Sequence, residues 1–419
     1  MTQRERDLDV VVHGATGFTG RLVARYLRDA APAGVAVGLS GRSSDRLREA
    51  REALGPRAAG WQLLRTDSAD DADVAALAAR ASVVVSTVGP YARHGLPLVR
   101  ACAAAGTDYV DLTGEVPFMR ASIDAAHEEA ARTGARVVHA CGFDSVPSDL
   151  GVHLLARAAR EHGLGTLTRT RFVLTGASGG VSGGTVASAR GLLESAGEDP
   201  RTRRLVADAY ALSPDRGREP DRTVAAGPGD GADPSGVEWD PVTGRWLAPF
   251  VMHQVNSRVV RRSNAVTGWS YGRGFTYREA VGLPGRWRGA PLAAGLAAGT
   301  AAVAAAASLP PTRRLLDGVL ERVLPAAGTG PDERTMTEGW FAVRLHSTTS
   351  TGRLVQARIR SQGDPGYVST ARMLGESALA LVLDRAGLPD RAGVLTPATA
   401  LGDVLVTRLR AAGTTLEVL

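Results

Sequence analysis

Short apolar runs alternate with helical patterns along the first 150 residues. The runs predict strands, and the stretches between them, in which apolar positions recur at helical spacing, predict helices. The predicted strands are 9–13, 35–40, 61–67, 82–88, 109–112 and 136–141, and the predicted helices are 22–30, 74–79, 96–105 and 118–133. Such alternation is typical of an α/β domain with a parallel sheet, helices on both faces and right-handed crossovers.

The pattern changes after residue 150. Alternating apolar and polar positions predict a strand and a later hairpin, whereas residues 213–241 are rich in Pro, Gly and Asp and predict a loop. The predicted strands are 167–175, 334–346 and 352–360, and the predicted helices are 185–194, 367–386 and 403–411. We therefore predict three segments: an α/β domain (1–150), an α+β domain with an antiparallel sheet (151–392) and a C-terminal segment (393–419).

A glycine turn joins the first predicted strand to the first helix: Gly14-Ala-Thr-Gly-Phe-Thr-Gly20. Gly14 permits the turn, Gly17 allows close approach to a pyrophosphate, and Gly20 lets the helix and strand pack closely. The N-terminus of the helix offers free N–H groups and a positive dipole end. We expect this turn to bind a dinucleotide, with contacts also from Thr16, Phe18 and Thr19; a turn that binds nothing is the alternative.

The second strand leads into Ser40-Gly41-Arg42, with no carboxylate before Asp45. NAD sites usually place an acid here for the ribose, whereas NADP sites place a cation for the 2′-phosphate. A guanidinium can hold a phosphate with two hydrogen bonds, and Ser40 and Ser43 offer donors. The sequence therefore favours NADP(H); the alternative is that Arg42 is one surface arginine among many.

Polar side chains follow three further predicted strands, in 86–95, 111–115 and 141–149. Ligands of such sheets bind beyond the carboxyl ends of the strands. Hydride transfer to a conjugated carbonyl compound benefits from a hydrogen-bond donor or proton donor near the carbonyl. Tyr91 and His94 are the candidate catalytic residues, with Asp144 as a weaker one. The alternative roles of these loops are structural: a turn at Gly89-Pro90, capping of the next helix by Asp111 and Glu115, and an N-cap in 145–148.

Composition narrows the remaining classes of function. The formal net charge is +6, yet all basic residues are arginine, so lysine Schiff-base chemistry is excluded. The arginines are scattered without interleaved aromatics or a nucleic-acid-binding motif, so we expect no nucleic-acid partner. Two cysteines and no metal-ligand spacing predict no disulfide framework and no metal site, and the charged N-terminus does not resemble a secretion signal, so we expect a cytoplasmic protein.

Residues 289–311 carry no charge and are mostly alanine and glycine. Their length matches a membrane span, but alanine gives little drive for insertion. We expect a helix that packs on the protein or lies against a membrane surface, so membrane association stays open.

These motifs together resemble the saccharopine dehydrogenase-like family, and within it the bacterial trans-acting enoyl reductases. The strings that carry the resemblance are Gly14–Gly20, Ser40–Arg42, Thr87–Tyr91, Tyr109–Glu115, Gly142–Asp149, Ser182–Thr185, Asp364–Tyr367 and Gly393–Gly402. The family implies a Rossmann-type doubly wound sheet, an inserted α+β domain and a C-terminal helix that returns to the first domain. It also implies that Thr87, Val88, Gly89 and Pro90 lie along the cofactor.

The resemblance implies an NADPH-dependent oxidoreductase that reduces a carrier-bound or lipid-like enoyl substrate in lipid or polyketide synthesis. A polyketide synthase or an acyl carrier protein would then be the partner. Two alternatives stay open: an amino-acid dehydrogenase of the saccharopine type, and a non-catalytic NADP-binding protein at a lipid surface.

Overall fold

The computed structural model describes residues 6–179, 199–219, 236–308 and 330–419. Contacts between residues divide the chain into two compact units. Among the described residues, unit 1 holds 6–146, Gly330 and 366–412, and unit 2 holds 147–179, 199–219, 236–308, 331–365 and 413–419. The chain therefore crosses between the units several times.

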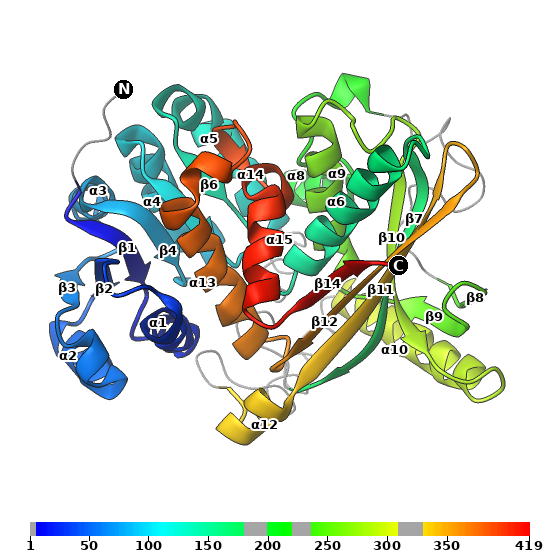
Figure 1. Cartoon of the computed structure of the whole chain (residues 1–419), viewed down its shortest axis with the longest axis horizontal. Coiled ribbons are helices and arrows are strands. Elements are labelled where there is room, and N and C mark those ends of the chain that lie inside the picture. The colour runs from blue at the N-terminus through cyan, green and yellow to red at the C-terminus, as the bar shows by residue number, and fades with distance from the viewer. Residues whose placement is uncertain (1–5, 180–198, 220–235, 309–329) are drawn as a thin grey trace. The chain divides into compact units, whose positions relative to one another are not determined.

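Unit 1 is built on a seven-stranded sheet in the order β13-β6-β5-β4-β1-β2-β3, and every pair in it is parallel (Figure 1). The strands are β1 (Leu8–His13), β2 (Val37–Gly41), β3 (Gln62–Arg65), β4 (Ala81–Ser86), β5 (Asp108–Asp111), β6 (Arg136–Val138) and β13 (Gly393–Leu395). The strand order reverses between β1 and β4, which is where ligands bind in sheets of this kind. The predicted Rossmann-type sheet is confirmed, with β13 as a further strand from the far end of the chain.

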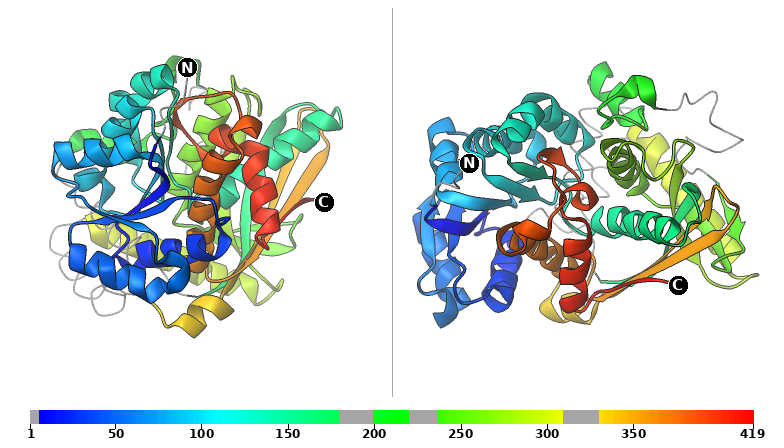
Figure 2. Two further views of the ribbon diagram at one scale, coloured as in Figure 1. Left: turned by 60° about the vertical axis from the view of Figure 1, so that its left-hand side comes forward. Right: turned by 45° about the horizontal axis from the view of Figure 1, so that its top comes forward.

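Helices cover both faces of this sheet (Figure 2). Helix α1 contacts α2 and α13, whereas α3 contacts α4 and α4 contacts α5. The helices are α1 (Phe18–Ala30), α2 (Ser44–Leu54), α3 (Asp71–Arg80), α4 (Tyr91–Ala105), α5 (Val116–Thr133), α13 (Val368–Leu383), α14 (Pro397–Ala400) and α15 (Gly402–Ala411). Because two helical layers shield the sheet, the central strands are apolar on both faces; Val10, Val11 and Val12 are all fully buried.

Helix α13 lies in unit 1, although the sequence analysis assigned its residues to the second domain. It contacts β1, β4 and β5 of the sheet and α1 beside it. Tyr26 of α1 donates a hydrogen bond to Glu376 of α13 at 2.5 Å, and an added Cβ at Gly375 would lie 2.4 Å from the Tyr26 ring. An apolar helix of this kind needs burial on nearly all sides, and the sheet face of unit 1 provides it.

Unit 2 contains a second seven-stranded sheet in the order β14-β12-β11-β7-β10-β9-β8. It is mixed, because β10 runs parallel to β7 while the other pairs are antiparallel. The strands are β7 (Leu167–Ser178), β8 (Glu238–Asp240), β9 (Arg245–Pro249), β10 (Thr276–Leu283), β11 (Trp340–Thr349), β12 (Leu354–Gln362) and β14 (Thr415–Val418). The predicted α+β part with a β11–β12 hairpin is confirmed.

Helices pack on this second sheet as well. Gly151 of α6 lets that helix approach β11, since an added Cβ would lie 2.6 Å from Leu345. Ser263 of α9 donates a hydrogen bond to Asp149 of α6, so these two helices lie side by side. Within its described residues, unit 2 has the helices α6 (Val146–Glu161), α8 (Pro200–Ala207), α9 (His253–Val266), α10 (Gly289–Ser308) and α12 (Glu333–Glu338).

Several predicted boundaries were wrong. The hairpin strand predicted from residue 334 begins at Trp340, because Asp332 caps a short helix, α12, through the N–H of Thr335. Helix α4 begins at Tyr91 rather than Leu96, even though Pro97 lies inside it. The predicted helix 185–194 lies outside the described residues.

Candidate cofactor and active site

The glycine turn between β1 and α1 requires glycine on two independent grounds. Gly14 has a positive φ of 87°, and an added Cβ there would lie 2.7 Å from Thr87 Oγ1 and 2.8 Å from Val88 Cγ2. At Gly20 the same atom would lie 2.1 Å from the carbonyl oxygen of Gly14. These approaches bring the start of α1, the end of β1 and the end of β4 together.

Among the residues that the structure describes, no side chain caps the N-terminus of α1. Its N-cap residue is Gly17, so no side chain caps the first N–H groups, and the first turn carries no acid. Gly17 is exposed, and an added Cβ would touch only the Gly14 carbonyl, at 3.3 Å. Uncapped N–H groups and the positive dipole end suit a pyrophosphate. The turn therefore fits the dinucleotide that the sequence predicts.

Ser40 supports the turn from β2. Its carbonyl oxygen accepts hydrogen bonds from the N–H groups of Gly14 at 2.9 Å and Ala15 at 3.1 Å. Its hydroxyl is fully buried and lies 3.0 Å from His13 Nδ1, while His13 Nε2 lies 2.8 Å from Ser68 Oγ. Burial lowers the pKa of His13 to about 4, so this imidazole is neutral at physiological pH. The Ser40 hydroxyl is thus engaged in the fold, and His13 is a supporting residue that the sequence analysis missed.

Arg42 follows the carboxyl end of β2. Its side chain is exposed, and it has no hydrogen-bond or ion-pair partner among residues 6–179, 199–219, 236–308 and 330–419. The Ser43 hydroxyl, by contrast, has a partner: it accepts a hydrogen bond from the N–H of Arg46 and so caps α2. Arg65, which the sequence analysis missed, is the residue that β3 places beside Gly41 in register, and its side chain is also exposed. This edge of the sheet thus presents the two exposed guanidinium groups of Arg42 and Arg65.

The loop 87–90 is fixed against the glycine turn. Thr87 Oγ1 donates to the carbonyl oxygen of His13 at 3.1 Å, and the Gly89–Pro90 peptide bond is cis. The carboxylate of Glu115 accepts the N–H groups of Tyr91 at 3.1 Å and Ala92 at 2.8 Å. Glu115 therefore caps α4, although it precedes α5 in the chain. The N-terminus of α4 is satisfied internally, unlike that of α1.

The structure places the two first-ranked catalytic candidates differently. Tyr91 is buried, its ring stacks on Phe118 with centroids 5.6 Å apart, and its hydroxyl donates to the carbonyl oxygen of Ser86 at 3.0 Å. Burial raises the pKa of the Tyr91 hydroxyl well above its usual value. His94 is exposed on the first turn of α4. Neither side chain presents a free donor held in a fixed position.

Asp144 has the environment of a proton donor. It lies in the loop between β6 and α6, at the carboxyl edge of the parallel sheet. Its carboxyl group has no hydrogen-bond or ion-pair partner in the part of the chain that the structure describes, and burial alone raises its pKa to about 6. The loop is anchored beside it, since the N–H of Phe143 donates to Thr370 Oγ1 at 3.0 Å. The loop is thus held in place, while the Asp144 carboxyl is not engaged by another described residue.

Asp111 also lies at this edge of the sheet, but its carboxylate is hydrogen-bonded within the protein. It accepts the N–H groups of Thr113 and Ala140, each at 3.1 Å, and lies 2.8 Å from His139 Nδ1. His139 Nε2 lies in turn 2.7 Å from Ser122 Oγ. All of these side chains are buried. The network joins β5, β6 and α5 and offers no exposed group to a substrate.

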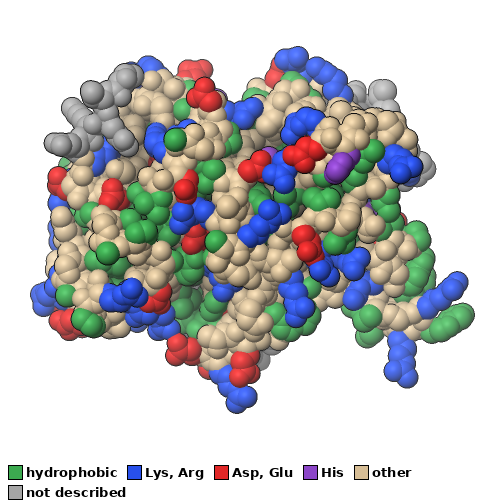
Figure 3. All heavy atoms as spheres, viewed as in Figure 1, with side chains coloured by type: hydrophobic (Ala, Val, Ile, Leu, Met, Phe, Trp, Pro, Cys, Tyr) green, Lys and Arg blue, Asp and Glu red, His purple; other side chains and the backbone are tan. Residues whose placement is uncertain are grey.

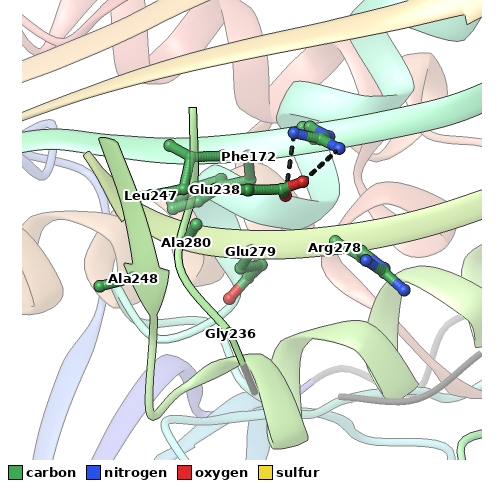
Figure 4. Close-up of a pocket in the computed structure, with 9 residues that line it drawn as sticks. Phe172, Gly236, Glu238, Leu247, Ala248, Arg278, Glu279 and Ala280 are labelled. Atoms are coloured by element: carbon green, nitrogen blue, oxygen red, sulfur yellow. Dashed lines mark hydrogen bonds and ion pairs between the residues drawn. The ribbon is translucent and has the colours of Figure 1, made fainter. Parts of the chain in front are cut away.

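A pocket in unit 2 contains none of the predicted site residues (Figure 4). Glu238 pairs with Arg171 across it at 2.9 Å. Glu279 accepts hydrogen bonds from Ser148 at 2.5 Å, Tyr277 at 2.7 Å and Asn256 at 3.0 Å, and burial raises its pKa to about 7. The lining residues are Arg171, Phe172, Gly236, Glu238, Leu247, Ala248, Arg278, Glu279 and Ala280.

Comparisons with known proteins agree with this geometry. Residues 10–138 match the family model of the saccharopine dehydrogenase NADP-binding domain. The solved structure of apo saccharopine dehydrogenase (L-Glu forming) from Saccharomyces cerevisiae covers 98% of this chain and 100% of its own, with a TM-score of 0.53 and 14% identity. That likeness shows a shared fold.

Mycobacterial relatives are much more similar in sequence. The trans-acting enoyl reductase of Mycobacterium bovis (strain BCG) is 46% identical over 99% of this chain and 98% of its own length. That of Mycobacterium leprae is 46% identical with the same coverage. A Mycobacterium tuberculosis (strain H37Rv) protein, provisionally given the same name, is 49% identical over 100% of this chain and 99% of its own.

The parallel sheet, the open glycine turn and the matching NADP-binding domain define an NADP-dependent oxidoreductase of the saccharopine dehydrogenase-like class. Within that class, the chain belongs to the family of the mycobacterial trans-acting enoyl reductases. The predictions of family and cofactor are confirmed, whereas the individual site residues stay predictions.

No helix among the residues that the structure describes is long and apolar enough to cross a membrane.

Proposed function

We propose that this chain reduces a conjugated enoyl thioester with NADPH, and that the acyl group is presented on a carrier domain of a polyketide synthase. The similarity over the full length to proteins named trans-acting enoyl reductase supports the reaction. The site observation that carries the proposal is Asp144, whose carboxyl lies on an anchored loop at the ligand-binding edge of the sheet and has no hydrogen-bond or ion-pair partner among the described residues.

NADPH, when bound, supplies a hydride. In our proposal the N–H groups after Gly17 hold its pyrophosphate, Arg42 meets the 2′-phosphate, and the loop 87–90 lies along its length. These residues come from β1, β2 and β4, the strands around the reversal of strand order. We assign Ser40 and Thr87 a positioning role, because their side chains bond within the protein.

Reducing a conjugated carbon–carbon double bond requires a hydride at the β-carbon and a proton at the α-carbon. Asp144 with a pKa near 6 retains roughly a tenth of its protons at pH 7 and can exchange them readily. We therefore assign Asp144 as the proton donor, ahead of Tyr91 and His94. Tyr91 would instead support the loop 87–90 through the hydrogen bond that its hydroxyl donates to the carbonyl oxygen of Ser86.

The decisive experiment follows NADPH oxidation with the purified chain and enoyl thioesters on acyl carrier protein and on coenzyme A. We expect turnover with a saturated product identified by mass spectrometry. Saccharopine serves as the comparison substrate, with NADP⁺ as oxidant. Turnover of saccharopine without enoyl reduction would assign the amino-acid dehydrogenase alternative, and tight NADPH binding without turnover of any substrate would assign the non-catalytic one.

A further inference from the structure

Helix α10 and the turn before it expose apolar side chains to an unusual degree. Trp287 is 86% exposed, Leu292 60%, Val303 46% and Leu296 41%. Figure 3 shows basic and hydrophobic side chains projecting together over the tip where β10 leads into α10 in Figure 1. We call Arg286, Trp287, Arg288, Leu292, Leu296 and Val303 the α10 surface. Exposed apolar groups concentrated on one element mark a binding surface more often than scattered ones do.

The aliphatic members of the α10 surface share one face of the helix. At 3.6 residues per turn, Leu292, Leu296 and Val303 fall within about 40° around the axis and span about 16 Å along it. The helix is attached to the sheet of unit 2 where Gly289 and Ala293 are buried and the helix contacts β9 and β10. The aliphatic row lies beside this attached side, and its three side chains are exposed.

The turn that carries Trp287 is held in place. Trp246 Nε1 of β9 donates to the carbonyl oxygen of Arg286 at 2.8 Å. An added Cβ at Gly289 would lie 3.0 Å from Trp246 Cδ1 and from the carbonyl oxygens of Leu283 and Pro284, so the backbone packs tightly here. Trp287 therefore projects from an anchored turn.

The charges within the segment that carries the α10 surface have one sign. Between residues 280 and 308 the only ionisable side chains are Arg286 and Arg288. Both are exposed, and neither has a hydrogen-bond or ion-pair partner for its side chain among the described residues. Arginines attract anionic lipid headgroups, and tryptophan is enriched at the interface between membrane and water. The basic groups meet headgroups while the indole and aliphatic groups enter the boundary region.

We propose that the α10 surface docks this protein on an anionic lipid bilayer. The observations favour a bilayer over an acidic protein domain, because exposed apolar side chains outnumber the two arginines on this surface. Docking of this kind goes beyond the proposed enoyl reduction and does not depend on it. It would hold the enzyme where long acyl substrates partition.

The test is co-sedimentation of the full chain with vesicles of phosphatidylcholine alone and of phosphatidylcholine with phosphatidylglycerol in equal parts. The charge variant is R286E/R288E and the apolar variant is W287A/L292A. We expect the wild-type chain to bind the anionic vesicles, each variant to bind about tenfold more weakly or less, and high salt to release the protein.

Control variants change exposed arginine and leucine side chains on the β11–β12 hairpin of the same unit. The variant R353E/R360E reverses two exposed arginines, and L354A removes a side chain that is 48% exposed. We expect both controls to bind like the wild type. All variants should bind NADPH with unchanged affinity, which shows that they are folded and separates this result from the fate of the proposed reaction.

Three outcomes would overturn the proposal. The wild-type chain could stay in the supernatant with anionic vesicles, or the α10 variants could bind as well as the controls. In the third outcome no vesicle binding is seen, and the α10 variants lose turnover only with the carrier-bound substrate. The α10 surface would then be a binding site for the carrier protein.

Discussion

Gly17 offers a substitution that separates cofactor binding from folding. Its φ of −78° and ψ of 166° suit any residue, and an added Cβ meets only the Gly14 carbonyl oxygen at 3.3 Å. Replacing an N-cap glycine by alanine should cost about 1 kcal/mol or less of stability. In the proposed site, however, the methyl group stands where the pyrophosphate meets the start of α1, and losing one charge-assisted hydrogen bond costs about 1.5–3 kcal/mol.

We therefore expect Gly17→Ala to weaken NADPH binding about tenfold to a hundredfold while the chain stays folded. Gly20→Ala should behave differently. Its Cβ would lie 2.1 Å from the Gly14 carbonyl oxygen, so the substitution overpacks this turn. Overpacking costs about 1–3 kcal/mol or more of stability. The higher helix propensity of alanine does not offset that cost. Gly34→Ala, where an added Cβ meets nothing within 4 Å, is the control.

The assays are titration calorimetry with NADPH and urea unfolding of each variant. The reasoning requires binding to fall in Gly17→Ala with nearly wild-type unfolding, and unfolding to shift in Gly20→Ala. NADPH affinity in Gly17→Ala equal to that of the Gly34→Ala control would refute the placement of the pyrophosphate at the N-terminus of α1.

Three further predictions concern single charged groups. Arg42→Ala should weaken NADPH binding about tenfold to a hundredfold and leave NADH binding unchanged by calorimetry; equal losses for both would remove Arg42 from the phosphate site. Asp144→Asn should lower kcat by about 10²–10⁴-fold and abolish the fall in rate that we expect above pH 6. The control Asp124→Asn changes an exposed carboxylate and should keep the wild-type kcat and the wild-type pH profile. A wild-type pH profile in Asp144→Asn would exclude Asp144 as the proton donor. Burial raises the pKa of Glu279 from 4.5 in the unfolded chain to about 7 in the folded chain. Between these two pH values the folded state therefore holds a proton that the unfolded state has lost. The free energy of unfolding of unit 2 should consequently fall by about 3 kcal/mol as the pH rises from about 4.5 to 7. Glu279→Gln should flatten that dependence in urea unfolding measured across the same pH range, and an unchanged slope would contradict the assignment.

The sequence did not predict the structural roles of three residues near the site, and each failure has a physical cause. Glu115 looked like a cap for the helix that it precedes, but its carboxylate caps α4, which is earlier in the chain. Ser40 looked like a phosphate ligand, but its hydroxyl bonds to His13. Arg65 was overlooked because its place beside Gly41 follows from strand register, which no local pattern encodes.

Local patterns sufficed for the nucleotide-binding half. A β-branched strand, a glycine turn and an amphipathic helix are specified by neighbouring residues, so the sequence by itself determined the parallel sheet, the dinucleotide turn and the preference for NADP. Only the tertiary structure decided that β13 joins β6, that α13 shields the first sheet, and that β14 completes the second. Those pairings join segments far apart in the chain, and what selects them is the burial of apolar faces and backbone edges that single segments leave exposed.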